Sequence, residues 1–413
     1  INFSRVLTLK YGYPVKNYLK QDKAVISVGR VMTCVLGMVV NREREIRQFV
    51  KTPFYRVTGR FALASSGEET NGGRSFEGEW RAVEGSAWFQ SPALYKENGF
   101  KKKEDAQKLI SFLEEEPQKA PVIEKIEKKK EQKNPPLLYN LAELQNDCSK
   151  MFKISPDETL KVVQELYEKK LVTYPRTDAR VLSTAVAKEI YKNINGLMRY
   201  EPMAGFAKEA MDLGSFKGIA KTRYVNDKQI TDHYAIVPTG QGLGALKSVN
   251  RTAFSVYTVI ARRFLSIFYP AAEYQKISLV LEKEKEKFFA GFRVLTAEGY
   301  LKVAGKPSEK GKDGENAEKL DGAFLEVLKS LKKDTLLPVN EFYIKEGETT
   351  PPKRYNSGSM ILAMENAGQL IEDDELRAQI KGSGIGTSAT RAEILKKLVS
   401  NGYLSLNAKT QII

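Results

Sequence analysis

The stretch SPDETLKVVQELYEKKLVTYPRTD, residues 155–178, combines a helix start, a helix and an extended segment that presents a tyrosine. Ser155 suits the N-cap position, Pro156 the first helical position, and Glu158 the third position after the cap, where its carboxylate can bond back to the cap. Apolar residues then recur at helical spacing, and two lysines fall in the last turn, where cations are favoured. The pattern predicts a helix that starts at Pro156 and stops just before Leu171.

Tyr174 follows this helix on a segment that we expect to be extended, because Pro175 disfavours helical geometry at the residue before it. Residues two apart on an extended segment share a face, so Arg176 would lie beside Tyr174. A free tyrosine has a pKa of about 10 and is a weak nucleophile. A guanidinium stabilises both a phenolate and the charge that develops on an attacked phosphate. Tyr174 and Arg176 are therefore candidate catalytic residues; the alternative is a half-buried strand tyrosine beside a surface arginine.

The chain has a single histidine, His233, in the segment 231–239 that reads TDHYAIVPT. An imidazolium can contact a phosphate, which makes His233 a third catalytic candidate. The alternative is a structural histidine.

A glycine-rich run, KGSGIGTSATR at residues 381–391, leads into a predicted helix with Thr387 or Ser388 as its cap. Helix N-termini approached by flexible glycines bind anions readily, and no strand precedes this one, so a DNA phosphate suits it better than a dinucleotide. The alternative is a plain helix cap.

Composition favours a globular protein with a polyanionic partner. Of the 413 residues 42% are hydrophobic, and the net charge is +15. No apolar run approaches a bilayer span; the best candidate, 24–40, reads as a buried helix. Residues 1–60 hold 12 Lys+Arg against 3 Asp+Glu, which favours nucleic acid over an anionic membrane surface. Cys34 and Cys148 form no zinc or disulfide pattern, and the acidic run 372–375 reads as a solvated turn, so no metal site is predicted.

The order of helix-like and strand-like segments along the chain predicts an α+β multidomain protein in which a helical insert divides a β-rich domain into two pieces. Strands are expected near 54–63, 276–281, 288–295 and 342–344, with a loop at 65–78 and a charged surface or linker at 101–133. Helices are expected over 1–50, 137–215 (one of them from Thr184 to Ile194) and 357–413. The predicted domains are a helical DNA-binding domain (1–52 and 350–413), a β-rich arch (53–134 and 246–349) and a helical tyrosine domain (135–245).

These segments together resemble the type IA DNA topoisomerases, in particular the bacterial or plasmid topoisomerase III branch. The resemblance covers essentially the whole chain, and the matching motifs, in chain order, are SVGRV (27–31) with REREI (42–46), LYNL (138–141) with LQ (144–145), QELYE (164–168), TYPRTD (173–178), DHYAIVPT (232–239), PPKRY (351–355) and GIGTSATRAE (384–393).

The resemblance implies a single-strand passage enzyme, an isomerase. Tyr174 would form a 5′-phosphotyrosine link, and a second strand or duplex would pass before resealing, without ATP. Arg176 would stabilise the scissile phosphate and His233 would orient it. The implied DNA-binding residues are Ser27, Arg30, Gln164, Thr177, Asp178, Lys228, Thr387 and Arg391. The β-rich domain would be the arch of a toroid, and the tyrosine domain its moving gate.

The resemblance also implies an acidic Toprim domain that binds Mg²⁺, and nothing in this sequence matches it. We therefore expect a fragment that binds single-stranded or underwound duplex DNA as a monomer but does not cleave it alone, from a protein of the bacterial cytoplasm. No cofactor is expected in the fragment itself. Met32 stands where the family has Gln, and Ser388 where it has Pro. The alternatives are a tyrosine recombinase or type IB enzyme, which the sequence after Tyr174 disfavours, and a non-catalytic single-stranded DNA clamp.

Overall fold

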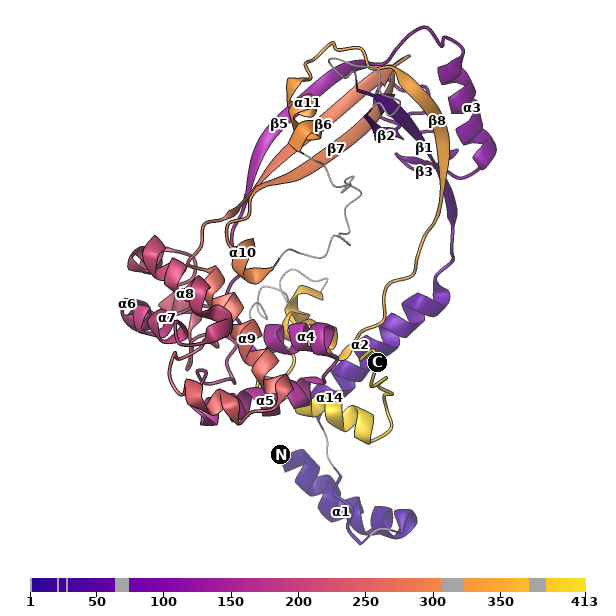
Figure 1. Ribbon diagram of the computed structural model, residues 1–413. Helices are drawn as coiled ribbons and strands as arrows, with labels where there is room; N and C mark the ends of the chain where they lie inside the picture. The colour runs from indigo at the N-terminus through magenta and orange to yellow at the C-terminus, as the bar shows by residue number, and fades with distance from the viewer. Residues whose placement is uncertain (1, 21, 27–28, 64–73, 306–321, 371–383) are drawn as a thin grey trace. The chain divides into compact units, whose positions relative to one another are not determined.

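The chain forms two compact units in a computed structural model that describes residues 2–20, 22–26, 29–63, 74–305, 322–370 and 384–413 (Figure 1). The first unit comprises Ile1–Gln48, Leu137–Phe264 and Pro352–Ile413, and the second comprises Phe49–Pro136 and Leu265–Pro351. The predicted α+β class is confirmed. One division falls after Pro136, two residues beyond the boundary that the sequence analysis placed between residues 134 and 135.

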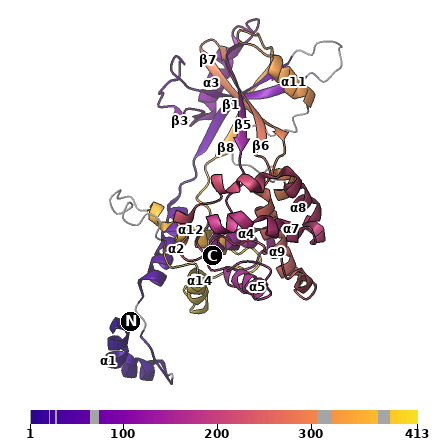
Figure 2. The ribbon, with the colours of Figure 1, turned by 90° about the vertical axis from the view of Figure 1, so that its left-hand side faces the viewer.

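Strands of the second unit form an antiparallel sheet (Figure 2). Eight strands are found among the described residues: β1 (Pro53–Ala62), β2 (Ser75–Arg81), β3 (Leu94–Lys96), β4 (Gly99–Phe100), β5 (Val122–Lys133), β6 (Ala272–Lys283), β7 (Glu286–Ala297) and β8 (Val339–Glu348). Their order is β3-β4-β1-β2-β7-β6-β5, and β8, which is not on this path, pairs with β1 from Pro53 to Phe61. The predicted strands are present, and each is as long as or longer than the sequence indicated.

The core of this unit is aromatic, with Phe61, Trp80, Phe100 and Phe288 fully buried among aliphatic side chains. Two helices cover it, α3 (Lys103–Glu114) and α11 (Gly322–Ser330), and a short helix, α10 (Leu301–Ala304), follows β7.

Two predictions in this unit were wrong. The charged stretch 101–133 is exposed over much of its length, as predicted, but it is not a linker, because it forms α3 and β5, and β5 pairs with β6 along its whole length. Residues 75–78, assigned to a loop, belong to β2.

The first unit is helical. Its α-helices are α1 (Asn2–Leu19), α2 (Arg30–Gln48), α4 (Leu141–Phe152), α5 (Pro156–Glu168), α6 (Thr184–Glu189), α7 (Tyr191–Leu197), α8 (Glu201–Leu213), α9 (Arg251–Ser266), α12 (Ser357–Glu365) and α14 (Arg391–Ser400). The 3₁₀ turns are η1 (Ser215–Lys221), η2 (Asp227–Gln229), η3 (Leu243–Lys247) and η4 (Ala367–Leu370). No helix formed by the described residues is long and apolar enough to cross a membrane.

Several helix predictions need correction. The helix expected from Thr184 to Ile194 is divided into α6 and α7 at Ile190. The buried helix expected at 24–40 begins only at Arg30 and is buried on one side, since Val35 is fully buried whereas Val40 is 38% exposed. After α14 the described chain continues in turns rather than helix. Finally, most of α9 packs in the first unit, although the sequence placed residues from 246 onward in the arch.

Candidate active site

Helix α5 begins at Pro156 and ends shortly before Tyr174, as the sequence predicted. The Ser155 hydroxyl accepts a hydrogen bond from the Glu158 amide at 3.2 Å, and the Ser155 amide donates to the Glu158 carboxylate at 2.8 Å, which completes a capping box. At the other end Lys170 has a left-handed backbone, with φ of 61°, and the Leu171 amide donates to the Leu166 carbonyl. This geometry closes a helix and turns the chain away from its axis.

The segment after α5 lies antiparallel to residues 235–239. The Thr173 amide donates to the Val237 carbonyl at 3.0 Å, and the Thr239 amide donates to the Leu171 carbonyl at 3.0 Å. The Thr173 hydroxyl also bonds twice, donating to the Ala235 carbonyl and accepting from the Val237 amide, both at 2.9 Å. Thr173 therefore aligns the tyrosine motif with the histidine motif, and the sequence reasoning missed this role.

Tyr174 and His233 are in contact. Their ring centroids lie 4.3 Å apart with planes inclined at 45°, and Tyr174 is half-buried whereas His233 is exposed. Tyr167, from the last turn of α5, packs edge-on against Tyr174 with centroids 5.4 Å apart. The sequence proposed Tyr174 and His233 from separate motifs, and the fold brings them together. The sequence gave Tyr167 only as part of the predicted helix and of the motif QELYE, with no role at the site.

Three of the predicted site residues carry polar groups that are open to a ligand. Neither the Tyr174 hydroxyl nor the Arg176 guanidinium has a hydrogen bond or ion pair with any described part of the chain, and Arg176 is exposed. Lys228 is exposed as well, and its ammonium has no partner among the residues that the structure describes. A phenol and two free cations can therefore meet an anionic ligand from solvent.

Thr177 does not present its side chain to solvent, contrary to its predicted DNA contact. It is 4% exposed, and its hydroxyl donates to the His233 carbonyl at 2.8 Å and accepts from the Ala179 amide at 3.1 Å. It therefore positions the histidine segment. Asp178, the next residue, has a half-exposed carboxylate that accepts from Arg391 at 2.9 Å.

Arg391 also departs from its predicted role as a phosphate contact. It is 4% exposed, and its guanidinium donates to the carbonyls of Ile385 and Gly386, each at 3.3 Å, in addition to Asp178. The glycine loop packs tightly here, because a Cβ on Gly384 would lie 2.7 Å from the Met364 carbonyl oxygen. Arg391 therefore binds the loop and Asp178, and its charge is not free for DNA.

Thr387 is exposed but does not cap a helix. Helix α14 begins at Arg391, and a turn at 388–390 precedes it. The Thr387 amide donates to the Thr390 hydroxyl at 2.9 Å, so the turn is closed by Thr390. Ser388 is not the cap either.

The remaining predicted DNA contacts differ in how far the structure describes them. Gln164 is half-buried, and its amide donates to the Glu168 carboxylate at 3.1 Å. Arg30 is the first residue of α2, and its side chain is outside what is described. Ser27, residues 381–383 and the acidic run 372–375 lie outside the described residues.

Asn140 joins the tyrosine segment to α12. It caps α4 by accepting from the Glu143 amide at 2.9 Å. Its amide nitrogen donates to the Asp178 carbonyl at 3.1 Å and to the Glu365 carboxylate at 2.6 Å. Burial raises the pKa of Glu365, with Asp178 and Glu143 adding to the rise and Arg391 opposing it. The sequence offered Asn140 only as part of a motif and did not single out Glu365.

The residues near Tyr174 do not fit the Mg²⁺ that the resemblance implies. No group of three His, Cys, Asp or Glu side chains able to hold a metal ion occurs in the part of the chain that the structure describes. Asp178, the carboxylate closest to Tyr174 in sequence, is paired with Arg391. Carboxylates that bind Mg²⁺ keep oxygens free for the metal, so no chemical step is assigned to a metal here.

Comparison of the chain with known proteins identifies its family. A family model described as DNA topoisomerase matches residues 1–413. The chain is 31% identical over 407 residues to DNA topoisomerase 3 of Bacillus subtilis, covering 97% of this chain and 49% of that protein. It is 32% identical over 418 residues to DNA topoisomerase 3 of Bacillus licheniformis, with 99% and 50% covered. It thus spans about half the length of these curated relatives.

A solved structure agrees with the fold. Full-length topoisomerase I from Thermotoga maritima superposes with a TM-score of 0.62 at 22% identity, over 98% of this chain and 57% of that one. With a family model that matches every residue, the chain belongs to the type IA DNA topoisomerase family.

Proposed function

We propose that Tyr174 is the nucleophile of a transient single-strand break in DNA. Its phenolic oxygen attacks the phosphorus, a tyrosyl–phosphate bond forms, and the bond from phosphorus to the 3′ oxygen breaks. The phenol loses its proton and the departing 3′ oxygen gains one, so the 5′ phosphate stays on the protein and a 3′ hydroxyl is released. Resealing is the reverse reaction. Because the energy of the broken bond is kept in the phosphotyrosine, no ATP is needed.

The observation that carries this proposal is the contact between Tyr174 and His233 at 4.3 Å. An exposed imidazole beside a half-buried phenol can orient a phosphate at the attacking oxygen. Arg176 is exposed two residues further on, where its guanidinium would stabilise the charge that develops on the phosphate. Each of these groups can approach the phosphate without breaking a hydrogen bond or ion pair to the described protein.

A bound single strand would extend beyond Tyr174, His233 and Arg176 to other polar side chains. We assign further strand contacts to Lys228 and Thr387, both exposed, and to Gln164, half-buried on α5. Ser27 and Arg30 stay proposals from the resemblance. The net charge of +15 supports a nucleic-acid partner, single-stranded or underwound duplex.

We further propose that the whole protein passes a second strand or duplex through the break before resealing it. The named relatives are DNA topoisomerases 3 of bacteria, about twice as long as this chain. We therefore assign cleavage to the whole protein, with Mg²⁺, and single-strand binding to this chain alone. We place it in the bacterial cytoplasm, with the nucleoid or a plasmid, as a monomer.

Covalent capture tests the nucleophile. The full-length protein, incubated with Mg²⁺ and an end-labelled single-stranded oligonucleotide, should give a denaturation-resistant adduct through the 5′ phosphate. Tyr174→Phe should abolish it, whereas Tyr167→Phe, which alters the neighbouring phenol 5.4 Å away, should retain it. A 3′ adduct refutes the proposal. Tight strand binding without any adduct favours the second candidate, a non-catalytic single-strand clamp, which the exposed cations Arg176 and Lys228 also suit.

A further inference from the structure

The side chain of Tyr174 is held by neighbouring rings and not by polar contacts. Its hydroxyl has no hydrogen bond to any described part of the chain, and the residue is half-buried. The hydrogen bonds of Thr173 fix the backbone just before it, but they leave the side-chain torsions of the tyrosine undetermined. The direction in which the phenol points therefore depends on what its ring packs against.

Two aromatic side chains of the described chain contact that ring. His233 lies at a centroid distance of 4.3 Å, and Tyr167 packs edge-on at 5.4 Å with the two planes inclined at 81°. Edge-on pairs at such distances are attractive, because the positive rim of one ring meets the negative face of the other. Tyr174 is thus packed against an imidazole and a second phenol.

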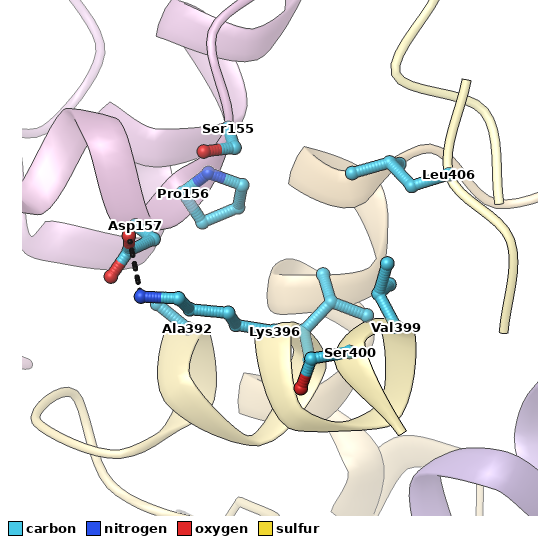
Figure 3. Close-up of a pocket in the computed structure, with 9 residues that line it drawn as sticks. Ser155, Pro156, Asp157, Ala392, Lys396, Val399, Ser400 and Leu406 are labelled. Carbon is cyan, nitrogen blue, oxygen red and sulfur yellow. Dashed lines mark hydrogen bonds and ion pairs between the residues drawn. The ribbon is translucent and has the colours of Figure 1, made fainter. Parts of the chain in front are cut away.

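Tyr167 is the firmer of these two contacts, because helix α5 is anchored at both ends. A capping box closes its start, and Asp157 in its first turn accepts a hydrogen bond from Lys396 of α14 at 3.3 Å (Figure 3). At the other end the Tyr167 carbonyl accepts from the Lys170 amide at 2.8 Å. His233, by comparison, is exposed and lies outside helix and strand.

The ring of Tyr167 is not part of the buried side of α5. Thr159, Val163 and Leu166 are fully buried on that side, whereas Tyr167 is 38% exposed. The Tyr167 hydroxyl, like that of Tyr174, has no hydrogen bond within the described chain. What Tyr167 offers to Tyr174 is therefore its ring.

We propose that Tyr167 is a positioning residue, whose ring limits the orientations of Tyr174 and keeps the phenol beside His233. Without that ring Tyr174 samples orientations in which its oxygen points away from the imidazole, and the fraction of molecules ready to attack a phosphate falls. The effect on strand cleavage rests on the proposed function, whereas the ordering of the two rings is a property of the folded chain.

The single histidine of the chain reports this ordering without catalysis. In a tag-free chain labelled with ¹³C-histidine, the ring of Tyr174 shifts the imidazole signal of His233, and Tyr174→Leu gives the position of that signal without the ring. At matched pH, Tyr167→Leu should move the signal about a third or more of the way to that position, because the Tyr174 ring is then displaced for part of the time. Tyr167→Phe keeps the ring and should leave the signal in place. Adding Tyr167→Leu to Tyr174→Leu should change nothing further, because Tyr167 acts through Tyr174.

Tyr191→Leu is the matched control, because it removes another half-exposed phenol of the same unit. Tyr191 is 43% exposed, and its ring packs against Phe216 with centroids 6.5 Å apart. Its loss should leave the His233 signal in place. A thermal melt shows whether each variant folds.

Three outcomes of these measurements overturn the proposal. The first is a folded Tyr167→Leu whose His233 signal does not move. The second is an equal movement of the signal in Tyr191→Leu or in Tyr167→Phe. The third is a Tyr167→Leu that does not fold, because the ring would then serve the stability of α5.

Adduct formation by the full-length protein, with Mg²⁺ and the labelled oligonucleotide, supplies a second readout. Tyr167→Leu should slow it by about tenfold while oligonucleotide affinity changes by about twofold or less, because misorientation of a reacting group costs rate rather than binding. Tyr167→Phe should form the adduct at the normal rate.

The two readouts separate this proposal from the proposed function. If the unaltered protein forms no adduct and Tyr167→Leu still moves the His233 signal, the proposed function fails and the ordering of the rings stands. If Tyr167→Leu forms the adduct at the normal rate, the function stands and the positioning role fails. A loss of affinity that equals the loss of rate would make Tyr167 a strand contact and would also refute the positioning role.

Discussion

Thr177→Val tests whether this threonine positions the histidine segment or contacts DNA. Valine keeps the shape of threonine but removes its hydroxyl, which donates to the His233 carbonyl at 2.8 Å and accepts from the Ala179 amide at 3.1 Å. Each neutral hydrogen bond contributes about 1 kcal/mol net, and a buried amide left without a partner costs about 1–3 kcal/mol. The Ala179 amide would be left buried, since Ala179 is 7% exposed, whereas water can reach the exposed His233. We therefore expect Thr177→Val to lower the free energy of unfolding by about 2 kcal/mol.

In a tag-free chain labelled with ¹³C-histidine, the only imidazole signal is that of His233, which lies in the first unit. This signal therefore reports the unfolding of the first unit alone. If the free energy of unfolding falls by about 2–3 kcal/mol per M of urea, a loss of about 2 kcal/mol lowers the midpoint of urea unfolding by about 0.7–1 M. Thr177→Ser is the control, since it keeps the hydroxyl and loses one buried methyl, at about 1 kcal/mol. The reasoning is refuted if the valine variant is as stable as the serine variant. A valine variant with native stability but a reduced salt dependence of oligonucleotide binding would restore Thr177 as a phosphate contact.

Three further predictions concern other parts of the chain. Arg176→Ala should weaken oligonucleotide binding and reduce the slope of log affinity against log salt by about 0.7 as one phosphate contact is lost, whereas Arg176→Lys should preserve that slope. Glu286→Ala should destabilise the second unit by about 3–5 kcal/mol, since the buried carboxylate accepts from Trp80, Ser86 and Ala87; the two tryptophans, both in this unit, provide fluorescence to measure it. Because burial raises the pKa of Glu365, its protonated form is favoured on folding, so the stability it contributes is present below its ordinary pKa and is lost as pH rises through the raised value. Glu365→Gln should flatten that loss and raise the urea midpoint of the His233 signal at neutral pH.

Local signals in the sequence predicted the presentation of Tyr174 well. The capping box of Ser155 and Glu158 and the restriction that Pro175 imposes act over a few residues, so they can be read without knowing the fold. The contact between Tyr174 and His233 could not be predicted from local signals, because the two residues are 59 positions apart in the sequence. Their pairing depends on Thr173 and Thr177, whose hydroxyls bond to backbone atoms that no local pattern indicates.

The stretch 101–133 shows where composition misleads. Its lysines and glutamates indicated a solvated surface or a linker, and it is not a linker, because much of it forms the strand β5. Within β5, Glu127 is bonded to Lys125 and Lys129, and these hydrogen bonds lower the pKa of Glu127 to about 2. Charges that neutralise one another along one face of a strand are compatible with a sheet. Charge density therefore predicts exposure to water, and it does not exclude secondary structure.

Arg176 and Arg391 illustrate why motif membership does not settle a role. Both belong to motifs shared with the family, but Arg176 is exposed without a partner in the described chain, whereas Arg391 is buried on Asp178, 213 residues away in sequence. Other cations are also paired with carboxylates of the same chain: Arg354 binds Glu43 at the surface, and Arg263 binds Asp147. An excess of basic residues therefore overstates the charge that DNA meets. The salt dependence of strand binding, which counts phosphate contacts, should follow exposed cations without a partner in the described chain, such as Arg176, and fall well below the net charge of +15.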